Sequence, residues 1–559
     1  MDAAEAAWKW GLQNAINHHG KADVTAVLRR VMADPKYRKK STPALVAKIV
    51  AQINLLSGAE QRDRLKAIAP QLLEPSHKAK KGLPPLPGAV RGNVVTRFPP
   101  EPNGYLHIGH AKAAWVDYEY ARMYRGKFIL RFDDTNPTTE RLEYYGLQKE
   151  DLQWLGIQWD KELCTSNAMP ALYSHATKLI ELGGAYVCTC DSSAIRERRS
   201  KGAGCACRSI AVEEQKRRWE RMRSDVKEKG ILRLKGDMNS ANTAMRDPTL
   251  FRIVTQEHPL QGNRYRVWPT YDFAGPVMDS ITGVTHAFRT KEYELRDEVY
   301  FYLLKMLGLR APTLLEFSRL QIEGMPCSKR ALKPLVTKGI GWDDPRLPTL
   351  RGLRRRGIQP EAIREFVLAQ GIGKGEAVLT FDRVEAINRK VLDPITPRYF
   401  FVPGPVPLTV EDAPIQTATL KMHPHRDLGK RSIKTEGKFF IPRGDVTALK
   451  VGGTFRLKDL YNVRVTDLSP QAIQGAFAGT HLTPGIKKVQ WVTPDNASVE
   501  VLMPGPLFVG GIYNPDSLRR VKGTAEKATA KVKVGSIVQF ERFGFCRKDD
   551  DAIFVFAHQ

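Results

Sequence analysis

The sequence lacks several features that would assign it to particular classes of protein. It contains no run of about 18 or more uninterrupted apolar residues, so a transmembrane helix is not expected. The N-terminus carries Asp2 and Glu5 and has no basic start followed by an apolar core, so no signal peptide is predicted. We therefore expect a cytoplasmic protein that does not associate with membranes.

Cysteine is scarce, with seven residues in a chain of 559. In an intracellular protein these cysteines are expected to be reduced or metal-bound, because disulfides persist in oxidising compartments. Four of them form a compact set, namely Cys188, Cys190, Cys205 and Cys207. Four thiolates suit a structural zinc ion, although a Cys-x-Cys pair is tighter than the usual ligand spacing. Four reduced cysteines in a β-hairpin are the alternative, and a catalytic role is not expected.

Acidic residues are few relative to basic ones. Lysine and arginine number 87 against 60 aspartates and glutamates, which gives a formal net charge of +27. Such an excess suggests a polyanionic partner, because basic side chains that contact phosphates release condensed counterions. A basic surface that serves solubility alone is the competing interpretation. The charge favours nucleic acid without indicating which kind.

A chain of this length exceeds one compact core, so several structural units are expected. Residues 1–74 show apolar residues at helical spacing, and a linker rich in lysine and proline follows them. The pattern then changes to a strand at 94–98, a helix at 109–124 and a strand at 127–132. This order predicts a parallel sheet, and ligands bind beyond the carboxyl ends of such strands.

Two later regions depart from the α/β pattern. A charged, arginine-rich stretch interrupts it at about residues 190–245, and the pattern resumes near Tyr265. From about residue 400 helical periodicity fades, and short β-rich runs such as 437–441 and 536–540 lie between glycines and prolines. These runs predict β-barrels in the C-terminal part of the chain. No dehydrogenase is expected, because no Gly-x-Gly-x-x-Gly follows the first strand.

The most informative segment spans residues 97–110 and reads RFPPEPNGYLHIGH. It combines a strand end, a stiff proline-bearing loop, and two histidines that flank Gly109 where the predicted helix begins. The first turn of a helix offers unpaired N–H groups and a positive dipole end to phosphate. A glycine lets a flat base approach the backbone closely. The segment therefore predicts a nucleotide-phosphate site with His107 and His110 as hydrogen-bonding groups.

This segment resembles the HIGH signature of the class I aminoacyl-tRNA synthetases, in the form found in glutamyl and glutaminyl enzymes. The second signature of that family is a lysine-bearing loop, KMSKS, and residues 325–330, which read MPCSKR, resemble it. Two positions depart from the family loop, since Pro326 replaces its first lysine and Cys327 its methionine. The Ser-Lys-Arg core is kept, with Lys329 as its central lysine.

The resemblance implies an ATP-dependent reaction, with Mg²⁺, in which the protein supplies no nucleophile. The carboxylate of an amino acid attacks the α-phosphate of ATP, and the terminal ribose of tRNA then accepts the activated amino acid as an ester. His107, His110 and Lys329 would be the catalytic residues, because they would stabilise charge on the triphosphate and pyrophosphate. The ATP-binding residues implied are His107, Gly109, His110, Ser328, Lys329 and Arg330.

Four residues match the amino-acid-binding positions of the family, namely Arg97, Asp133, Tyr271 and Arg289, with Asp133 expected at the substrate ammonium. Glutamyl enzymes place an arginine where Arg289 stands, whereas glutaminyl enzymes usually have cysteine. A guanidinium pairs with a carboxylate in bidentate fashion, and a neutral amide would leave its charge poorly compensated. We therefore expect L-glutamate as substrate, with a glutaminyl-tRNA synthetase as the alternative. An inactive tRNA-binding paralogue is another alternative, although both signatures are kept.

A triplet, Arg354-Arg355-Arg356, resembles the family segment that lies along the inside of the tRNA. Contacts of these arginines with phosphate would position the RNA without reading its sequence. The expected partner is tRNA(Glu), and the resemblance leaves open whether tRNA(Gln) is charged with glutamate as well. We expect a monomer.

The resemblance implies the fold of the archaeal and eukaryotic glutamyl branch, in four parts. These are a helical N-terminal extension and linker (1–88), a Rossmann-like catalytic domain (89–315) with an inserted acceptor-binding domain at about 190–262, a subdomain with the KMSKS-like loop and stem-contacting helices (316–398), and β-barrel anticodon-binding domains (399–559). Zinc held by the four cysteines would stabilise the inserted domain.

Overall fold

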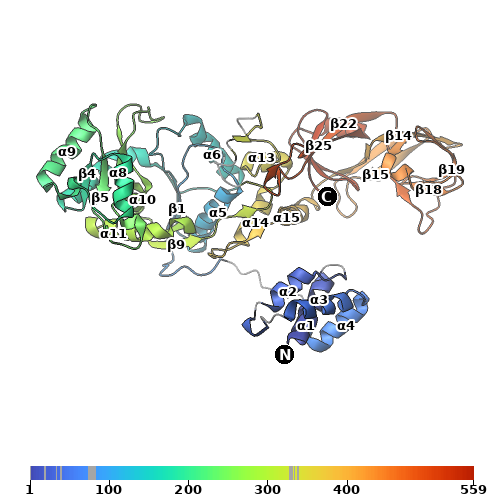
Figure 1. The fold of residues 1–559 in the computed structure, drawn as a ribbon. Coiled ribbons are helices and arrows are strands. Elements are labelled where there is room, and N and C mark those ends of the chain that lie inside the picture. The colour runs from blue at the N-terminus through green and yellow to red at the C-terminus, as the bar shows by residue number, and fades with distance from the viewer. Residues whose placement is uncertain are drawn as a thin grey trace. The chain divides into compact units, whose positions relative to one another are not determined.

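The computed structural model of the chain describes residues 2–17, 20–32, 34–37, 41–72, 83–326, 332, 334–335 and 339–559. The chain forms two compact units, residues 1–82 and 83–559 (Figure 1). Each unit has hydrophobic core clusters of its own. Among the described residues, no helix is both long enough and apolar enough to cross a membrane.

The N-terminal unit is helical, as predicted. Gly11 marks a close approach of two of its helices, because a Cβ at this position would lie 2.5 Å from Cδ1 of Ile53. Asp23 and Ser57 cap two helices by accepting hydrogen bonds from backbone N–H groups of the first turn. Its helical elements are α1 (Ala3–Asn17), α2 (Val24–Val31), η1 (Pro35–Tyr37), α3 (Thr42–Ile53), α4 (Gly58–Ile68) and η2 (Pro70–Leu72).

A parallel sheet lies at the centre of the second unit. Its strands β1 (Val95–Phe98), β2 (Lys127–Phe132) and β3 (Lys161–Cys164) pair in that order. A hydrogen bond of 2.9 Å from the Thr285 N–H to the Val95 carbonyl brings the parallel pair β8 (His286–Thr290) and β9 (Thr313–Phe317) beside β1. The predicted strands, the parallel pairing and the helix between them are confirmed. The connecting helices are α5 (Ile108–Met123), α6 (Leu142–Trp154), α10 (Tyr271–Ile281), η6 (Lys291–Arg296) and α11 (Asp297–Leu307).

The region between β3 and α10 forms a separate antiparallel sheet, of order β4-β5-β6-β7, with helices packed around it. It contains the arginine-rich stretch that interrupts the α/β pattern, and Trp219 and Trp268 are fully buried in its core. Its elements are η3 (Thr165–Ala168), α7 (Met169–Glu181), β4 (Ala185–Cys188), α8 (Ser192–Ser200), η4 (Ala206–Ser209), α9 (Val212–Ser224), β5 (Ile231–Leu234), η5 (Thr243–Met245), β6 (Thr249–Ile253) and β7 (Val267–Pro269).

The segment after β9 returns to the start of α5. The Ile108 N–H donates to the Pro348 carbonyl and the Leu350 N–H donates to the Leu106 carbonyl, both at 2.9 Å. These two bonds connect the loop that holds His107 to the first turn of α13. The elements in this segment are β10 (Gln321–Ile322), α13 (Leu350–Arg356), α14 (Pro360–Leu368), β11 (Val378–Leu379) and α15 (Asp382–Leu392).

The C-terminal part is β-rich, as predicted, and contains two strongly curved sheets. The two edge strands of the seven-stranded sheet are β12 and β13. Only Phe400 lies between these two strands in the chain, so the two edges are close together and the sheet is nearly closed. In the six-stranded sheet, of order β17-β14-β20-β19-β18-β21, the Phe440 N–H donates to the Val492 carbonyl at 2.8 Å and joins the two edges.

These sheets contain β12 (Arg398–Tyr399), β13 (Phe401–Pro403), β14 (Pro405–Glu411), β17 (Lys438–Pro442), β18 (Thr454–Leu457), β19 (Asn462–Leu468), β20 (Ile473–Phe477), β21 (Lys488–Val489), β22 (Asn496–Pro504), β25 (Leu518–Glu526), β26 (Ile537–Phe540), β27 (Gly544–Lys548) and β28 (Ile553–His558). Two hairpins project from them, β15–β16 (Gln416–Lys421 and Lys430–Thr435) and β23–β24 (Phe508–Val509 and Ile512–Tyr513). The short helices are α16 (Arg443–Val446) and η7 (Lys527–Lys531).

Candidate active site

A cavity of about 530 Å³ lies at the carboxyl ends of β1, β2 and β8. This is the edge of a parallel sheet at which ligands bind. All seven described residues that the sequence predicts for ATP and amino acid line it: Arg97, His107, Gly109, His110, Asp133, Tyr271 and Arg289. Ser328, Lys329 and Arg330, predicted for the same site, lie outside the described residues.

The first turn of α5 presents the two histidines of the cavity. His107 is the N-cap residue, and its Nδ1 accepts a hydrogen bond of 3.1 Å from the Gly109 N–H. The His107 N–H donates to Nδ1 of His110 at 3.2 Å, and the two rings lie 3.8 Å apart. A Cβ at residue 109 would lie 2.9 Å from Cε1 of His107. A larger residue at position 109 would therefore collide with the His107 ring. Glycine is needed here for this contact as well as for the predicted approach of a base.

A buried network of charged groups connects two residues of the cavity lining, Arg97 and Asp133. Asp279 accepts hydrogen bonds from Arg97 at 2.9 Å and from Arg131 at 2.6 Å, and Tyr300 donates to it at 2.8 Å. Burial alone would raise the pKa of Asp279, but Arg97 and Arg131 outweigh burial and lower this pKa to about 2. The Arg97 guanidinium also donates to the Phe288 carbonyl, so its contacts with the protein fix its position.

Asp133 lies at the end of β2 and is partly open to the cavity, with 17% of its side chain exposed. Its carboxylate accepts hydrogen bonds of 2.8 Å from Arg131 and from the Thr165 hydroxyl. These contacts orient the carboxylate at the cavity wall. Such a group can bind an ammonium ion.

Arg289, on β8, also lines the cavity. Its Nη2 donates to Asp297 and to Glu316, and the latter bond is 3.1 Å long. Burial raises the pKa of the neighbouring Tyr271 to about 12, although Arg289 and Arg97 oppose this shift. The cavity therefore combines a partly exposed carboxylate at Asp133 with a guanidinium at Arg289, as a ligand with an ammonium and an additional carboxylate requires.

The three arginines of the predicted tRNA-contact triplet differ in environment. Arg354 is exposed and lies over the Trp154 ring. Arg355 is half-buried and paired with Asp549 at 2.7 Å. Arg356 is buried and paired with Glu385 at 2.6 Å, so its guanidinium does not reach the surface. The triplet is thus not a single exposed basic patch.

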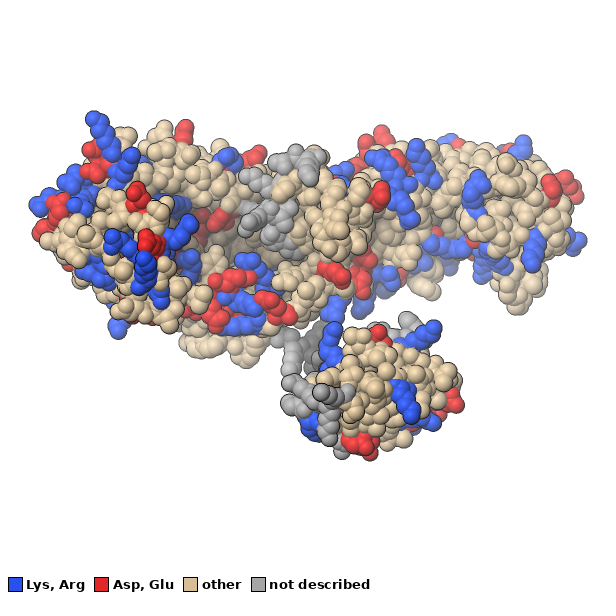
Figure 2. Space-filling model, viewed as in Figure 1, with Lys and Arg blue, Asp and Glu red and all other residues tan. Residues whose placement is uncertain are grey.

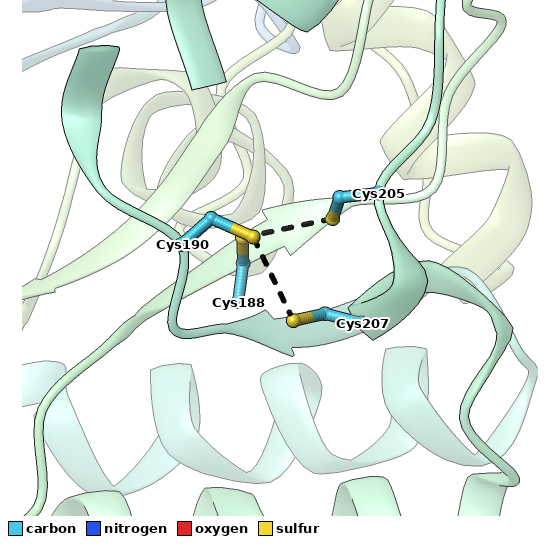
Figure 3. Close-up of side chains that lie close together, drawn as sticks. All are labelled: Cys188, Cys190, Cys205 and Cys207. Atoms are coloured by element: carbon cyan, nitrogen blue, oxygen red, sulfur yellow. Dashed lines mark hydrogen bonds between the residues drawn. The ribbon is translucent and has the colours of Figure 1, made fainter. Parts of the chain in front are cut away.

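The four clustered cysteines meet between β4 and η4 (Figure 3). Their sulfur atoms all lie within 4.8 Å of one another, with Cys188 and Cys205 3.8 Å apart and Cys190 and Cys207 3.9 Å apart. Tetrahedral zinc with Zn–S bonds of about 2.3 Å requires sulfur–sulfur separations of about 3.8 Å. The donor set therefore fits one tetrahedral ion. Arg233 donates to the Cys188 sulfur at 3.8 Å and offsets negative charge there.

Basic side chains are spread over the face drawn in Figure 2, among them those of the region that contains α8 and α9. A second cavity, of about 510 Å³, lies where the two C-terminal sheets meet. Its lining includes the buried pair Arg431–Glu526, joined at 2.5 Å, and four lysines, Lys434, Lys438, Lys527 and Lys531. It also includes the carboxylates Glu436 and Asp495, which pair with Lys434 and Lys527, so five basic groups face three acidic ones. The charge of this cavity suits a phosphate-bearing ligand.

Comparisons with known proteins identify the family. Residues 93–394 match the model of the catalytic domain of class I tRNA synthetases (E and Q). Residues 396–484 and 488–549 match the two anticodon-binding domain models of the same group. The chain belongs to the class I (E and Q) tRNA synthetases.

Curated members of this synthetase family align over the full chain. A protein named glutamate–tRNA ligase from Cenarchaeum symbiosum is 45% identical, with 100% of both chains covered. Proteins of the same name from Nitrosopumilus maritimus and Pyrococcus furiosus are 43% and 42% identical, with 99% and 100% of this chain and 98% and 100% of theirs covered. The resemblance to this family is confirmed, and these relatives belong to archaea, as the predicted archaeal and eukaryotic glutamyl branch requires.

Several charged residues of the synthetase site were not predicted from the sequence. Arg131 and Asp279 connect Arg97 to Asp133, and Glu316 and Asp297 hold Arg289. A signal was present for the first two, because each interrupts an apolar stretch of a buried strand or helix. Buried charges of this kind require partners.

Proposed function

We propose that this synthetase ligates L-glutamate to the 3′ end of tRNA(Glu) in two steps, through a glutamyl-adenylate formed from ATP. The observation that carries the proposal is Arg289 in the cavity that also contains Asp133, His107 and His110. An arginine in this position matches a γ-carboxylate and disfavours a neutral amide. The full-length relatives named glutamate–tRNA ligase support the same substrate.

The chemistry of the first step requires positioning more than protein nucleophiles. The glutamate α-carboxylate attacks the α-phosphate of ATP, and pyrophosphate leaves. We assign Asp133 to the substrate ammonium, Arg97 and Tyr271 to the amino-acid pocket, and Arg289 to the side-chain carboxylate. His107 and His110 would stabilise the phosphates from the start of α5, and Lys329 would neutralise charge on the pyrophosphate. Mg²⁺ would accompany ATP and reduce the charge of its phosphates.

The remaining predictions for tRNA follow the same family pattern. We propose the four parts predicted from the sequence: a helical extension (1–88), a catalytic domain (89–315), a stem-contacting subdomain (316–398) and an anticodon-binding region (399–559). The insertion at about 190–262 of the catalytic domain would bind the acceptor end of the tRNA. A structural zinc ion held by the four cysteines would stabilise this insertion. The described geometry supports phosphate contact for Arg354 and a structural role for Arg356. The basic cavity between the C-terminal sheets is proposed to receive the anticodon end.

The test is aminoacylation of purified tRNA(Glu) and tRNA(Gln) transcripts, each with labelled glutamate and labelled glutamine. We expect glutamate transfer to tRNA(Glu), and transfer to tRNA(Gln) as well would identify an enzyme that does not discriminate between the two. Transfer of glutamine would establish the glutaminyl alternative. No transfer of either amino acid would favour an inactive tRNA-binding paralogue.

Two substitutions test the residues proposed to bind the glutamate side chain and the pyrophosphate. Arg289→Ala should raise the KM for glutamate by about 100-fold while the KM for ATP changes little, because only the carboxylate loses its partner. Lys329→Ala should slow ATP–pyrophosphate exchange, assayed with tRNA present, while tRNA binding is kept. An unchanged glutamate KM in the first variant would place the substrate carboxylate elsewhere.

A further inference from the structure

Arg289 lies beside two acidic side chains. Its Nη2 makes ion pairs with both Asp297 and Glu316, which leaves Nε and Nη1 for other acceptors. Arg289 and Glu316 are almost completely buried, with 3% and 8% of their side chains exposed. These contacts hold the guanidinium in one place, because a buried charge is stable only beside its partners.

Two carboxylates beside one guanidinium would give the cluster an excess of negative charge. Such an excess would oppose the binding of a further carboxylate in the cavity, because electrostatic interactions are strong where water is excluded. The cluster therefore needs another positive charge if Arg289 is to attract a ligand carboxylate.

Lys374 supplies this charge from a different part of the chain. Its Nζ lies 3.3 Å from Oε2 of Glu316 and 2.8 Å from Oε1 of Glu294. Glu316 thus contacts Arg289 through one carboxylate oxygen and Lys374 through the other. Lys374 and Glu294 are both about half exposed, whereas the Glu316 side chain is almost completely buried. Water therefore screens the Glu294 charge more than the Glu316 charge, and Lys374 offsets Glu316 from the solvent side.

The backbone fixes the segment that contains Lys374. Lys374 follows Gly373 in a glycine-rich stretch, 371–375, and the Gly373 carbonyl accepts a hydrogen bond of 3.0 Å from the Ser318 N–H. Ser318 directly follows β9, the strand that contains Glu316. Lys374 is therefore held beside Glu316 by a main-chain contact and by its ion pairs.

We propose that Glu316 and Lys374 are positioning residues for Arg289 and thereby determine how strongly the site binds the side-chain carboxylate of its substrate. Glu316 fixes the guanidinium, and Lys374 offsets the charge of Glu316 so that Arg289 attracts the substrate. This inference rests on the proposed function, because it assumes that Arg289 binds the glutamate side chain.

The experiment is steady-state aminoacylation of tRNA(Glu) with glutamate varied, for Glu316→Leu, Glu316→Gln, Lys374→Ala and the double variant Glu316→Gln/Lys374→Ala. Glu316→Leu removes the anchor of Arg289, and we expect the glutamate KM to rise by about 30-fold. Glu316→Gln keeps an oxygen acceptor for Nη2, so its KM should stay within about threefold of wild type. The KM for ATP should be unchanged in every variant.

Lys374→Ala should raise the glutamate KM by about fivefold, because it leaves the Glu316 charge uncompensated. In the Glu316→Gln background the same substitution should have no effect on this KM, since that background has no charge to offset. Lys291→Ala is the matched control, because Lys291 pairs with Glu376 at 2.6 Å in the adjoining segment. This control should keep the wild-type KM.

The outcomes separate this inference from the proposed function. Failure of the wild-type enzyme to charge tRNA with glutamate would overturn both. Glutamate charging by wild type with an unchanged KM in Glu316→Leu, or equal effects of Lys374→Ala in both backgrounds, would overturn only the positioning role. An equal rise of the ATP KM in Glu316→Leu would indicate general damage to the fold and would also overturn that role.

Discussion

Tyr300 donates a hydrogen bond of 2.8 Å to Asp279, and both side chains are almost fully buried. The ring of Tyr300 also lies 5.3 Å from Cζ of Arg289. One side chain on α11 therefore contacts the carboxylate that holds Arg97 and, through its ring, the guanidinium proposed to bind the substrate. The two arginines of the amino-acid pocket share this support.

The substitution Asp279→Asn tests the network around this carboxylate. It leaves two buried guanidinium groups, Arg97 and Arg131, without the charge that compensates them. We expect the free energy of unfolding to fall by about 3–5 kcal/mol, because removal of one partner from a buried pair leaves an unpaired charge. Tyr300→Phe removes one hydrogen bond and should cost about 1–2 kcal/mol. Urea unfolding checks both, and equal losses in the two variants would contradict the assignment.

The exposed and the buried arginines of the triplet should have different roles, one in tRNA binding and the other in stability. Arg354→Ala should weaken tRNA binding about two- to tenfold and flatten its salt dependence, because an exposed phosphate contact is lost. Arg356→Ala should leave tRNA affinity unchanged but lower the melting temperature, because it removes the buried pair with Glu385. Filter binding over a range of salt concentrations and thermal unfolding distinguish the two. A large loss of tRNA affinity in a stably folded Arg356→Ala protein would show that the assignment is wrong.

Substitution of one clustered cysteine should release metal. Protein purified without chelator should contain one zinc ion per chain, and Cys188→Ser should reduce that content strongly. Cys546→Ser is the matched control, because Cys546 is buried in the C-terminal sheet and lies outside the cluster. Elemental analysis provides the readout. Equal zinc content in the two variants, or none in wild type, would leave the alternative of four reduced thiols.

His558 should make stability depend on pH. Burial lowers the pKa of His558 to about 4, and the neutral ring accepts a hydrogen bond of 2.9 Å from the Asn388 amide at Nε2. The unfolded chain, with a histidine pKa of about 6.5, then binds the proton more tightly than the folded protein. Folding stability is therefore unaffected above about pH 6.5 and should fall by up to about 3 kcal/mol between pH 6.5 and 4.

A matched variant isolates this effect from the titration of carboxylates over the same range. His558→Gln removes the ionisable ring and should reduce the pH dependence of the unfolding free energy over that interval by about the same amount. Parallel stability curves for wild type and variant would mean that His558 does not titrate between the two states.

Local patterns in the sequence were sufficient to predict the elements that carry the site. The strand over Lys127–Phe132 is apolar except for its charged residues, and the turn from His107 to His110 supplies the start of α5. The signatures within these elements then led to residues that line one cavity. Such predictions succeed because they concern neighbours in the chain.

Partners distant in the chain could not be predicted in this way. Arg356 is buried because α13 packs against the C-terminal sheet, and its guanidinium donates a hydrogen bond to the Ala557 carbonyl of that sheet. Nothing in the sequence of the triplet distinguishes Arg356 from Arg354. Likewise, the pairing of Glu316 with Lys374 depends on a loop that returns to the end of β9. Burial set by tertiary packing decides which of several similar charges faces solvent.

The backbone pairing of Leu106 and Ile108 with Pro348 and Leu350 also limits how this enzyme can be divided. A fragment that ends near residue 315 would contain strands β1, β2 and β3 and both histidines, yet the strand-like stretch before α5 would lose its hydrogen-bonding partner. Truncations intended to yield a minimal activating fragment should therefore end after α15, beyond Leu392, where the loop that presents His107 keeps its support.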